Sequence, residues 1–219
     1  MMELEELLHD EPPAKRLARH GYNRLLLLAD AVYAIAVTLA ALEIRPQGAH
    51  GSVAELWRAL SLPVLAYLLS FGVIAIYWAV HRDTYARLRR VDGALTLIAL
   101  SHLFCIALLP AFTKLMYEDL TAASLSVYAI GVSACGLTQA LSWAYVAARP
   151  GLLEAGYSPT YRAVRLGSSL LIPVYFLWVA LAGARLGETA LFGAFVVVAL
   201  LIAVRLGVLR PRDPARAAA

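Results

Sequence analysis

One carboxylate stands out in this sequence because it lies inside a long apolar run. Asp30 is about one and a half helical turns into the run Leu25–Ile44. A carboxylate in the interior of a bilayer costs several kcal/mol unless it is partnered, so it is there for structure or for function. Arg24, or a residue of another helix, could be the partner. Asp30 is therefore either an architectural acid or part of an ion pathway, and the sequence leaves both open.

Further polar residues interrupt the next two apolar runs. Trp78 and His81 lie at the end of the second run, while Ser101 and His102 lie in the middle of the third. Trp78 could belong to an interfacial aromatic belt, and a single buried His is most often a packing residue with one hydrogen bond. His81 is near the depth of Asp30, so a contact between them is feasible. A zinc site would need closer ligand spacing than these residues have, and we expect no metal.

A helical wheel divides the first run into two faces. At about 100° per residue, Ala34 and Val37 fall within roughly 40° of Asp30. A second stripe lies between roughly 80° and 140° from Asp30 and consists of Ala31, Ile35, Thr38 and Leu42. If this stripe faced a symmetry axis, Ile35 would form a hydrophobic constriction that gates by dewetting. Otherwise the stripe faces lipid or the protein core. Thr38 is expected to bond to its own helix backbone.

The composition places these residues in a membrane protein. The chain has 219 residues, of which 61% are hydrophobic and 16% are charged, whereas soluble domains average about 45–50% and about 25%. This excludes an ordinary soluble enzyme, a disordered chain and a disulfide scaffold. Cys105 and Cys135 lie inside apolar runs and are expected to pack as small hydrophobic residues.

Six apolar runs are long enough, or nearly so, to cross a hydrocarbon core of about 30 Å as helices. They are Leu25–Ile44, Leu62–Val80, Gly93–Thr113, Leu120–Ala148, Leu166–Ala184 and Thr189–Val204. The runs are too long and too uniformly apolar for barrel strands. We therefore predict an all-α integral membrane protein with six transmembrane helices. A short interfacial helix is expected over residues 52–60, and kinks or helix ends at Pro63, Pro110 and Pro173.

The basic residues predict the orientation. Fifteen of the 19 Lys and Arg residues fall on the side that carries both termini, the second loop and the fourth loop. Such residues concentrate in cytoplasmic loops, so both termini are expected in the cytoplasm. The positive net charge is thereby assigned to the membrane surface and not to nucleic acid. We expect a cytoplasmic segment over residues 1–23, one membrane domain over 24–209 and a cytoplasmic tail over 210–219.

Three stretches resemble a known family. The first span, with Arg24 and Asp30, resembles the Arg-x3-Phe-Ser-Asp helix of the endosomal and lysosomal potassium channels called transmembrane protein 175 and of their bacterial homologues. Residues 77–81 resemble the family's Trp-x-x-His, and residues 108–113 its Pro-Phe-x-Thr, with Ala111 inserted. Leu28 and Ala29 replace the signature Phe and Ser. The family has an Asn in helix three, for which either Ser101 or His102 must stand in.

The resemblance implies a potassium channel, with K⁺ as the permeant ion, no cofactor and no enzymatic activity. Bacterial members carry one six-helix unit per chain and form tetramers without a re-entrant filter loop, and some members also pass protons. Asp30 would pack inside the subunit with Arg24, Trp78 and His81. Ile35 would form the tightest ring of the pore, with Thr38 and Leu42 as further layers. The partners would be further copies of the chain and the lipid of a bacterial plasma membrane.

Two other classes of function remain open from the residues alone. A proton-coupled secondary transporter would use Asp30 and His81 as a relay, although the inverted repeats and broken helices of such carriers are not visible in the sequence. A membrane enzyme or scaffold would need a larger polar constellation than Asp30, His81 and His102.

Overall fold

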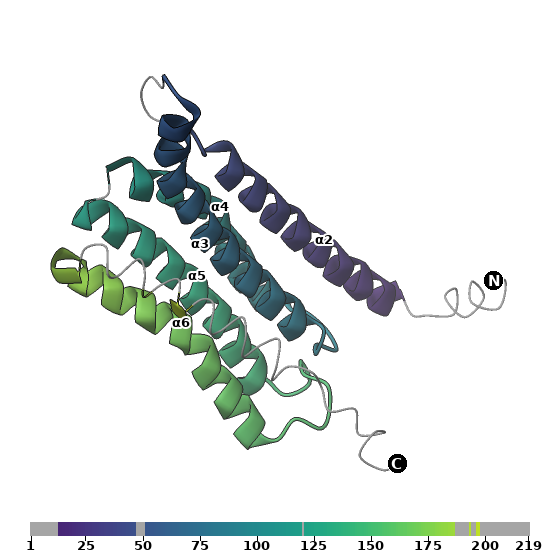
Figure 1. Ribbon diagram of the computed structural model, residues 1–219. Helices are drawn as coiled ribbons and strands as arrows, with labels where there is room; N and C mark the ends of the chain where they lie inside the picture. Colours follow the sequence, from purple (N-terminus) through teal and green to yellow (C-terminus); the bar gives the residue numbers. More distant parts are fainter. Residues whose placement is uncertain (1–12, 47–50, 120, 187–192, 194–195, 198–219) are drawn as a thin grey trace, which may run out of the picture.

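The chain forms a bundle of long helices. The computed structural model describes residues 13–46, 51–119, 121–186, 193 and 196–197. Their helices, labelled as in Figure 1, are α2 (Pro13–Leu42), α3 (Val53–Tyr85), α4 (Gly93–Asp119), α5 (Ala122–Ala148) and α6 (Pro159–Leu186). Within the described residues, five helices are long and apolar enough to cross a membrane. The predicted sixth span, residues 189–204, lies almost entirely outside the described residues.

The helices are arranged as a sequence of neighbours across the bundle. α2 packs on α3 and α4, α5 packs on both of these helices, and α6 packs on α5. Figure 1 shows α2 along one edge and α6 along the opposite edge. One apolar core fills the middle of the bundle, and a second fills the end at which α2 begins. The edge position leaves one long face of α2 without a partner in a single subunit.

Two helices extend beyond the predicted apolar runs, and the predicted separate helix over residues 52–60 was wrong. α2 begins at Pro13, since proline is well suited to the first position of a helix and charged residues can continue the helix outside the bilayer. The expected interfacial helix over 52–60 and the second span are one helix, α3, which contains Pro63. Pro110 and Pro173 likewise lie inside helices. Transmembrane helices tolerate proline because neighbouring groups satisfy the freed carbonyl.

Side chains cap the starts of the helices. The Ser52 hydroxyl accepts a hydrogen bond from the Glu55 amide, 3.3 Å away, at the start of α3. The Asp92 carboxylate accepts one from the Leu95 amide, 2.9 Å away, at the start of α4. Thr121 forms a capping box before α5. These bonds satisfy amide groups that have no partner within the helix.

Close contact between α3, α5 and α6 depends on a glycine. A Cβ atom added to Gly136 would lie 2.7 Å from Pro173 Cβ, Pro173 Cδ and the Tyr77 hydroxyl. The proline ring and the helix backbones leave little room for adjustment.

We therefore expect Gly136→Ala to destabilise the protein by about 1–3 kcal/mol, as overpacking of a core does. Thermal unfolding of the purified protein in detergent measures the effect. Gly167→Ala is the matched control, because a Cβ there meets nothing within 4 Å and replacing a helical glycine by alanine stabilises by up to about 1 kcal/mol. Equal unfolding temperatures for the two variants would contradict this packing.

Candidate functional site

The two faces of α2 have different environments. One face is buried against the bundle through Leu25, Ala29, Tyr33, Ala36 and Ala40. The predicted pore residues Ala31, Ile35, Thr38 and Leu42 are all exposed in the single subunit. Ile35 exposes 56% of its surface, and the Thr38 hydroxyl donates to the carbonyl groups of Ala34 and Ile35 at 3.1 and 2.9 Å. The stripe is therefore available either to other copies of the chain or to lipid.

Asp30 is held at the border between these two faces. The Trp78 indole N–H of α3 donates to Asp30 Oδ1 over 2.8 Å, and Asp30 nevertheless remains exposed in the single subunit. The Arg82 guanidinium lies over the Trp78 ring, 4.7 Å from its centroid. A hydrogen bond to an ionised acceptor contributes about 1.5–3 kcal/mol, so the indole fixes the carboxylate and helps to fix α2 on α3.

The structure does not place Arg24 and His81 on Asp30. Arg24 is exposed, and it precedes Ile35 by about three turns, which puts it on the exposed stripe. An Arg24–Asp30 ion pair is absent among the described residues. His81 is buried and stacks on Tyr85, with ring centroids 4.2 Å apart. Of the expected partners of Asp30, only Trp78 contacts it. Arg24 does not, because its position on the helical wheel differs from that of Asp30 by about 120°.

His102, and not Ser101, faces the interior of the subunit. His102 Nδ1 lies 3.0 Å from the Cys135 carbonyl oxygen and 3.0 Å from the Thr138 hydroxyl. Its Nε2 lies 2.6 Å from the Tyr33 hydroxyl. Since a carbonyl can only accept, Nδ1 carries the proton in the neutral ring, and the Tyr33 hydroxyl donates to Nε2. Ser101 is exposed and donates to the Leu97 carbonyl of its own helix at 2.9 Å.

A buried polar cluster therefore lies behind α2. The rings of His81 and His102 are nearly parallel, with centroids 5.7 Å apart, and Gln139 is buried in the same region of α5. Both ring nitrogens of His81 and both amide atoms of Gln139 lack a hydrogen-bond partner among the described residues. Reasoning from the sequence missed Tyr33, Thr138 and Gln139. The one feature of the sequence that could have indicated them is the recurrence of polar side chains along one face of α2 and one face of α5.

The cluster does not have the form of a metal centre. Within the part of the chain that the structure describes, no group of three or more His, Cys, Asp or Glu residues could hold a metal ion. Asp30 is hydrogen-bonded to Trp78, and the two imidazole rings lie nearly parallel with their centroids 5.7 Å apart. The arrangement is suited to holding helices in register.

We expect Tyr33→Phe to destabilise the protein by about 1–3 kcal/mol, because it leaves His102 Nε2 buried without a donor. The unfolding temperature in detergent measures the loss. Tyr67→Phe is the control: Tyr67 is half-buried, and its hydroxyl makes no hydrogen bond within the described residues. If both variants unfold at the same temperature, the Tyr33–His102 hydrogen bond does not stabilise α2 on the bundle.

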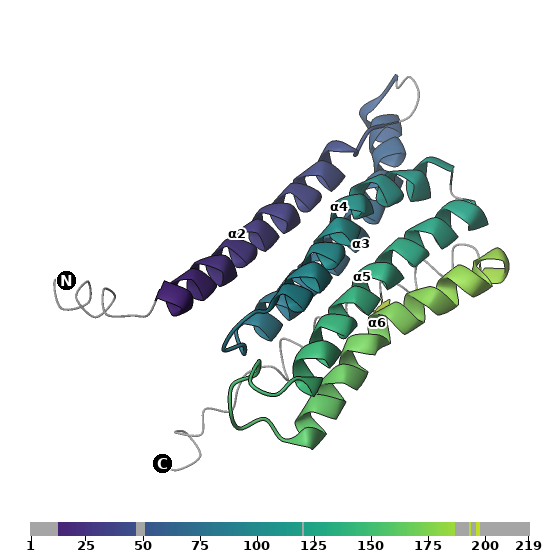
Figure 2. The same ribbon diagram turned by 180° about the vertical axis from the view of Figure 1, so that it is seen from behind.

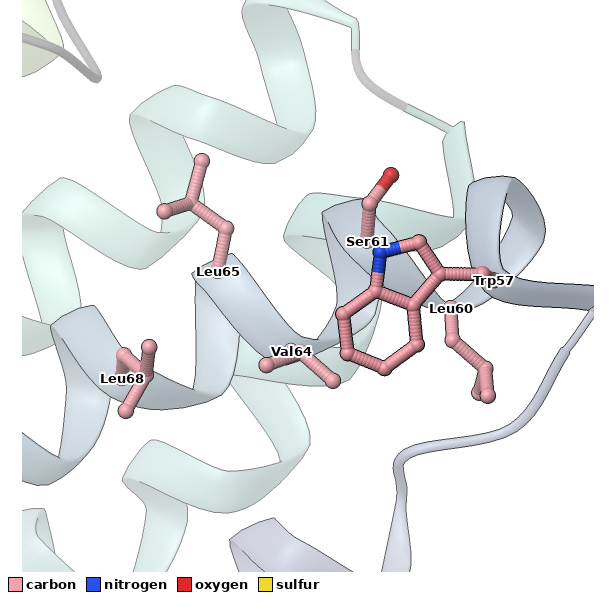
Figure 3. A pocket seen from close by; sticks show the side chains of 6 residues that line it. All are labelled: Trp57, Leu60, Ser61, Val64, Leu65 and Leu68. Atoms are coloured by element: carbon pink, nitrogen blue, oxygen red, sulfur yellow. The ribbon is translucent and has the colours of Figure 1, made fainter. Parts of the chain in front are cut away.

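An apolar groove follows the N-terminal half of α3. Figure 3 shows its lining side chains, Trp57, Leu60, Ser61, Val64, Leu65 and Leu68. Its single hydroxyl, that of Ser61, donates to the Arg58 carbonyl at 2.7 Å. Apart from this hydroxyl and the Trp57 indole N–H, which cannot coordinate a cation, the lining is apolar. Helix α2 therefore remains the better candidate for a pathway.

The chain is similar to proteins of known class. The model of the family described as endosomal/lysosomal potassium channel TMEM175 matches residues 24–110, which hold Asp30, Trp78 and His102. A potassium channel of Streptomyces collinus is 30% identical over 189 residues, covering 79% of this chain and 91% of that protein. The chain belongs to the TMEM175 family. It is therefore a multi-pass membrane protein and a cation channel, and it is not an enzyme.

Other TMEM175 relatives extend the comparison. The human endosomal/lysosomal proton channel TMEM175 is 27% identical over 157 residues, covering 66% of this chain and 31% of the human protein. The fold matches the crystal structure of a lysosomal potassium-selective channel TMEM175 homolog from Chamaesiphon minutus. The TM-score is 0.72 at 24% identity, and the match covers 84% of this chain and 97% of that chain.

Proposed function

We propose that this chain is a potassium-selective channel in which α2 lines the pore and Ile35 forms its hydrophobic constriction. Four copies assemble around a common axis in a bacterial plasma membrane. Each copy has six transmembrane helices and cytoplasmic termini. Ala31, Thr38 and Leu42 form further layers of the pore, and no cofactor takes part.

The exposure of Asp30 is the observation that carries this proposal. Its carboxylate has one N–H partner, from Trp78, and otherwise faces outward from a membrane-spanning helix. Lipid chains cannot solvate a carboxylate, so that side of α2 must meet water or another protein surface. A ring of copies with α2 innermost satisfies this need, and it places the neighbouring stripe of Ile35 toward the axis.

The choice of K⁺ as the ion is supported by the S. collinus relative, which is named a potassium channel and is matched over nearly its whole length. The human relative is named a proton channel, so the proton is the competing ion. Hydrophobic constrictions gate by dewetting and leave selectivity to the geometry and polarity of the lining.

Reconstituted protein tests the proposal. Liposomes that contain the purified chain are expected to release K⁺ faster than Na⁺ down equal gradients, without saturation, and native mass spectrometry is expected to give four copies. Flux of protons alone would overturn the potassium assignment. Saturable, pH-coupled flux that is abolished by Asp30→Asn would instead establish the proton-coupled transporter.

A further inference from the structure

Two loops are joined into one surface at the end of the bundle where α2 begins. Residues Leu88 and Leu153 form an antiparallel β-bridge between the α3–α4 loop and the α5–α6 loop. The Arg89 amide donates to the Leu152 carbonyl at 2.9 Å, and the Glu154 amide donates to the Arg87 carbonyl at 3.0 Å. Figure 2 shows the α5–α6 loop beneath the helix ends. Residues displayed by these loops are thus fixed relative to one another.

Some arginines at this end serve the fold. The Asp83 carboxylate binds Arg165 at 2.5 Å and Arg87 at 2.6 Å. Arg165 also lies over the Trp143 ring, 4.6 Å from its centroid, and Arg162 donates to the Ala147 carbonyl at 3.0 Å. These guanidinium groups are committed to internal partners.

Three other arginines are directed outward. Arg89, Arg90 and Arg149 are exposed, and the ion pairs of the described residues do not include them. Gly151 has φ +82°, and a Cβ atom there would lie 3.8 Å from Arg90 Nη2, so the Arg90 side chain reaches the α5–α6 loop. The Arg149 guanidinium lies over the Tyr145 ring at 5.4 Å.

The acids nearby offset only part of the charge of this group. Asp92 Oδ1 accepts from the Leu95 amide and Oδ2 accepts from the Tyr145 hydroxyl at 2.8 Å. The pKa of Asp92 is lowered, first by the Leu95 amide and further by the Tyr145 hydroxyl and the positive charges of Arg149 and Arg90. Glu154 is exposed in the adjoining loop. Arg89, Arg90 and Arg149 together thus outnumber the Asp92 and Glu154 carboxylates by one positive charge.

We propose that Arg89, Arg90 and Arg149 form a binding site for the phosphate of an anionic phospholipid headgroup. Guanidinium groups bind phosphate oxygens with paired N–H donors. The site lies where the apolar helices α3 and α5 end and α4 begins. A bound lipid would therefore also place its chains along exposed apolar side chains such as those of Leu97 and Leu141. A soluble phosphate would interact with the guanidinium groups but would make no such apolar contact.

The inference rests on the proposed orientation, in which these loops face the cytoplasm. The cytoplasmic leaflet carries anionic lipid, and each basic residue near its surface contributes about 1 kcal/mol, or about fivefold in affinity. The joined loops distinguish this site from a general excess of positive charge, since they fix the backbone segments that carry these arginines before any lipid binds.

Native mass spectrometry of the full-length oligomer tests the site. Phosphatidylglycerol is expected to bind better than phosphatidylcholine, and the triple variant Arg89→Gln, Arg90→Gln, Arg149→Gln is expected to weaken that binding at least tenfold. Arg45→Gln with Arg58→Gln, at the opposite end, is the control and should retain it. Glycerol 1-phosphate at millimolar concentration should not displace the lipid.

The outcomes separate the possibilities. Undiminished phosphatidylglycerol binding by the triple variant, or an equal loss in the control, would overturn the lipid site. Displacement by glycerol 1-phosphate would show a site for soluble anions instead. Arg149→Gln alone, with an expected loss of about fivefold, replaces the triple variant if the latter does not assemble. Potassium flux is measured separately, so lipid binding without flux contradicts only the proposed channel function.

Discussion

Ile35→Asn is expected to raise K⁺ conductance at least about tenfold and to reduce the preference for K⁺ over Na⁺. The reason is that, in the proposed tetramer, a dry ring of four Ile35 side chains would oppose the entry of water and hydrated ions, whereas four amide groups would attract water. A decrease of about 1.4 kcal/mol in the barrier gives a tenfold faster rate, which is modest beside the roughly 1.5–3 kcal/mol of apolar transfer free energy that each isoleucine carries. Single-channel recording measures both conductance and selectivity.

Leu171→Asn is the matched control for this substitution. Leu171 lies on α6 and exposes 55% of its surface, against 56% for Ile35. In the proposed oligomer Leu171 faces lipid at the periphery, so the same polar change should leave conductance and selectivity unaltered. Identical behaviour of the two variants would remove Ile35 from the pore.

Trp78→Phe is expected to destabilise the oligomer by about 2–3 kcal/mol and to impair gating, because it leaves the Asp30 carboxylate without its donor in the membrane-spanning region. The unfolding temperature in detergent measures the first effect, and open probability in a bilayer measures the second. Loss of this single indole N–H is thus expected to weaken the packing of α2 on α3 and to change the open probability of the channel.

Two variants show whether the hydrogen bond itself is responsible. Asp30→Asn keeps a carbonyl acceptor for the Trp78 indole and removes the charge, so its stability should stay within about 1 kcal/mol of the original protein. Trp57→Phe deletes an indole N–H that is not hydrogen-bonded among the described residues, and it should have little effect on either readout. A loss for Trp57→Phe as large as that for Trp78→Phe would show a general effect of indole size.

Much of the fold could be predicted because apolar runs of about 20 residues leave few alternatives to membrane helices. The helix boundaries were harder to predict from the sequence. Helix α2 continues outward to Pro13 through charged turns, and α3 continues through Pro63. Hydropathy shows where a chain is apolar, whereas a helix ends where other groups satisfy its free backbone N–H and C=O groups. Neither charged residues nor a single proline ends a helix that is supported by neighbouring helices.

The candidate site was less predictable from the sequence. A helical wheel separates the faces of α2 but does not show which face is buried. The exposure of Asp30 could therefore be seen only in the packed bundle. The choice between Ser101 and His102 depended on a rotation of about 100° about α4. The partners of His102, which are Tyr33, Cys135 and Thr138, come from two other helices, and hydroxyl groups in apolar helices commonly bond to their own backbone instead.

Block by Ag⁺ tests most directly whether the exposed stripe of α2 surrounds the ion pathway. The measurement is K⁺ current through Ile35→Cys in a background where Cys105 and Cys135 are replaced by alanine, since Ag⁺ is small, enters water-filled pores and binds thiolates. We expect micromolar Ag⁺ to abolish the current of this variant and to leave the background and Leu171→Cys unaffected. Persistent current through Ile35→Cys, with block of Leu171→Cys instead, would contradict the account.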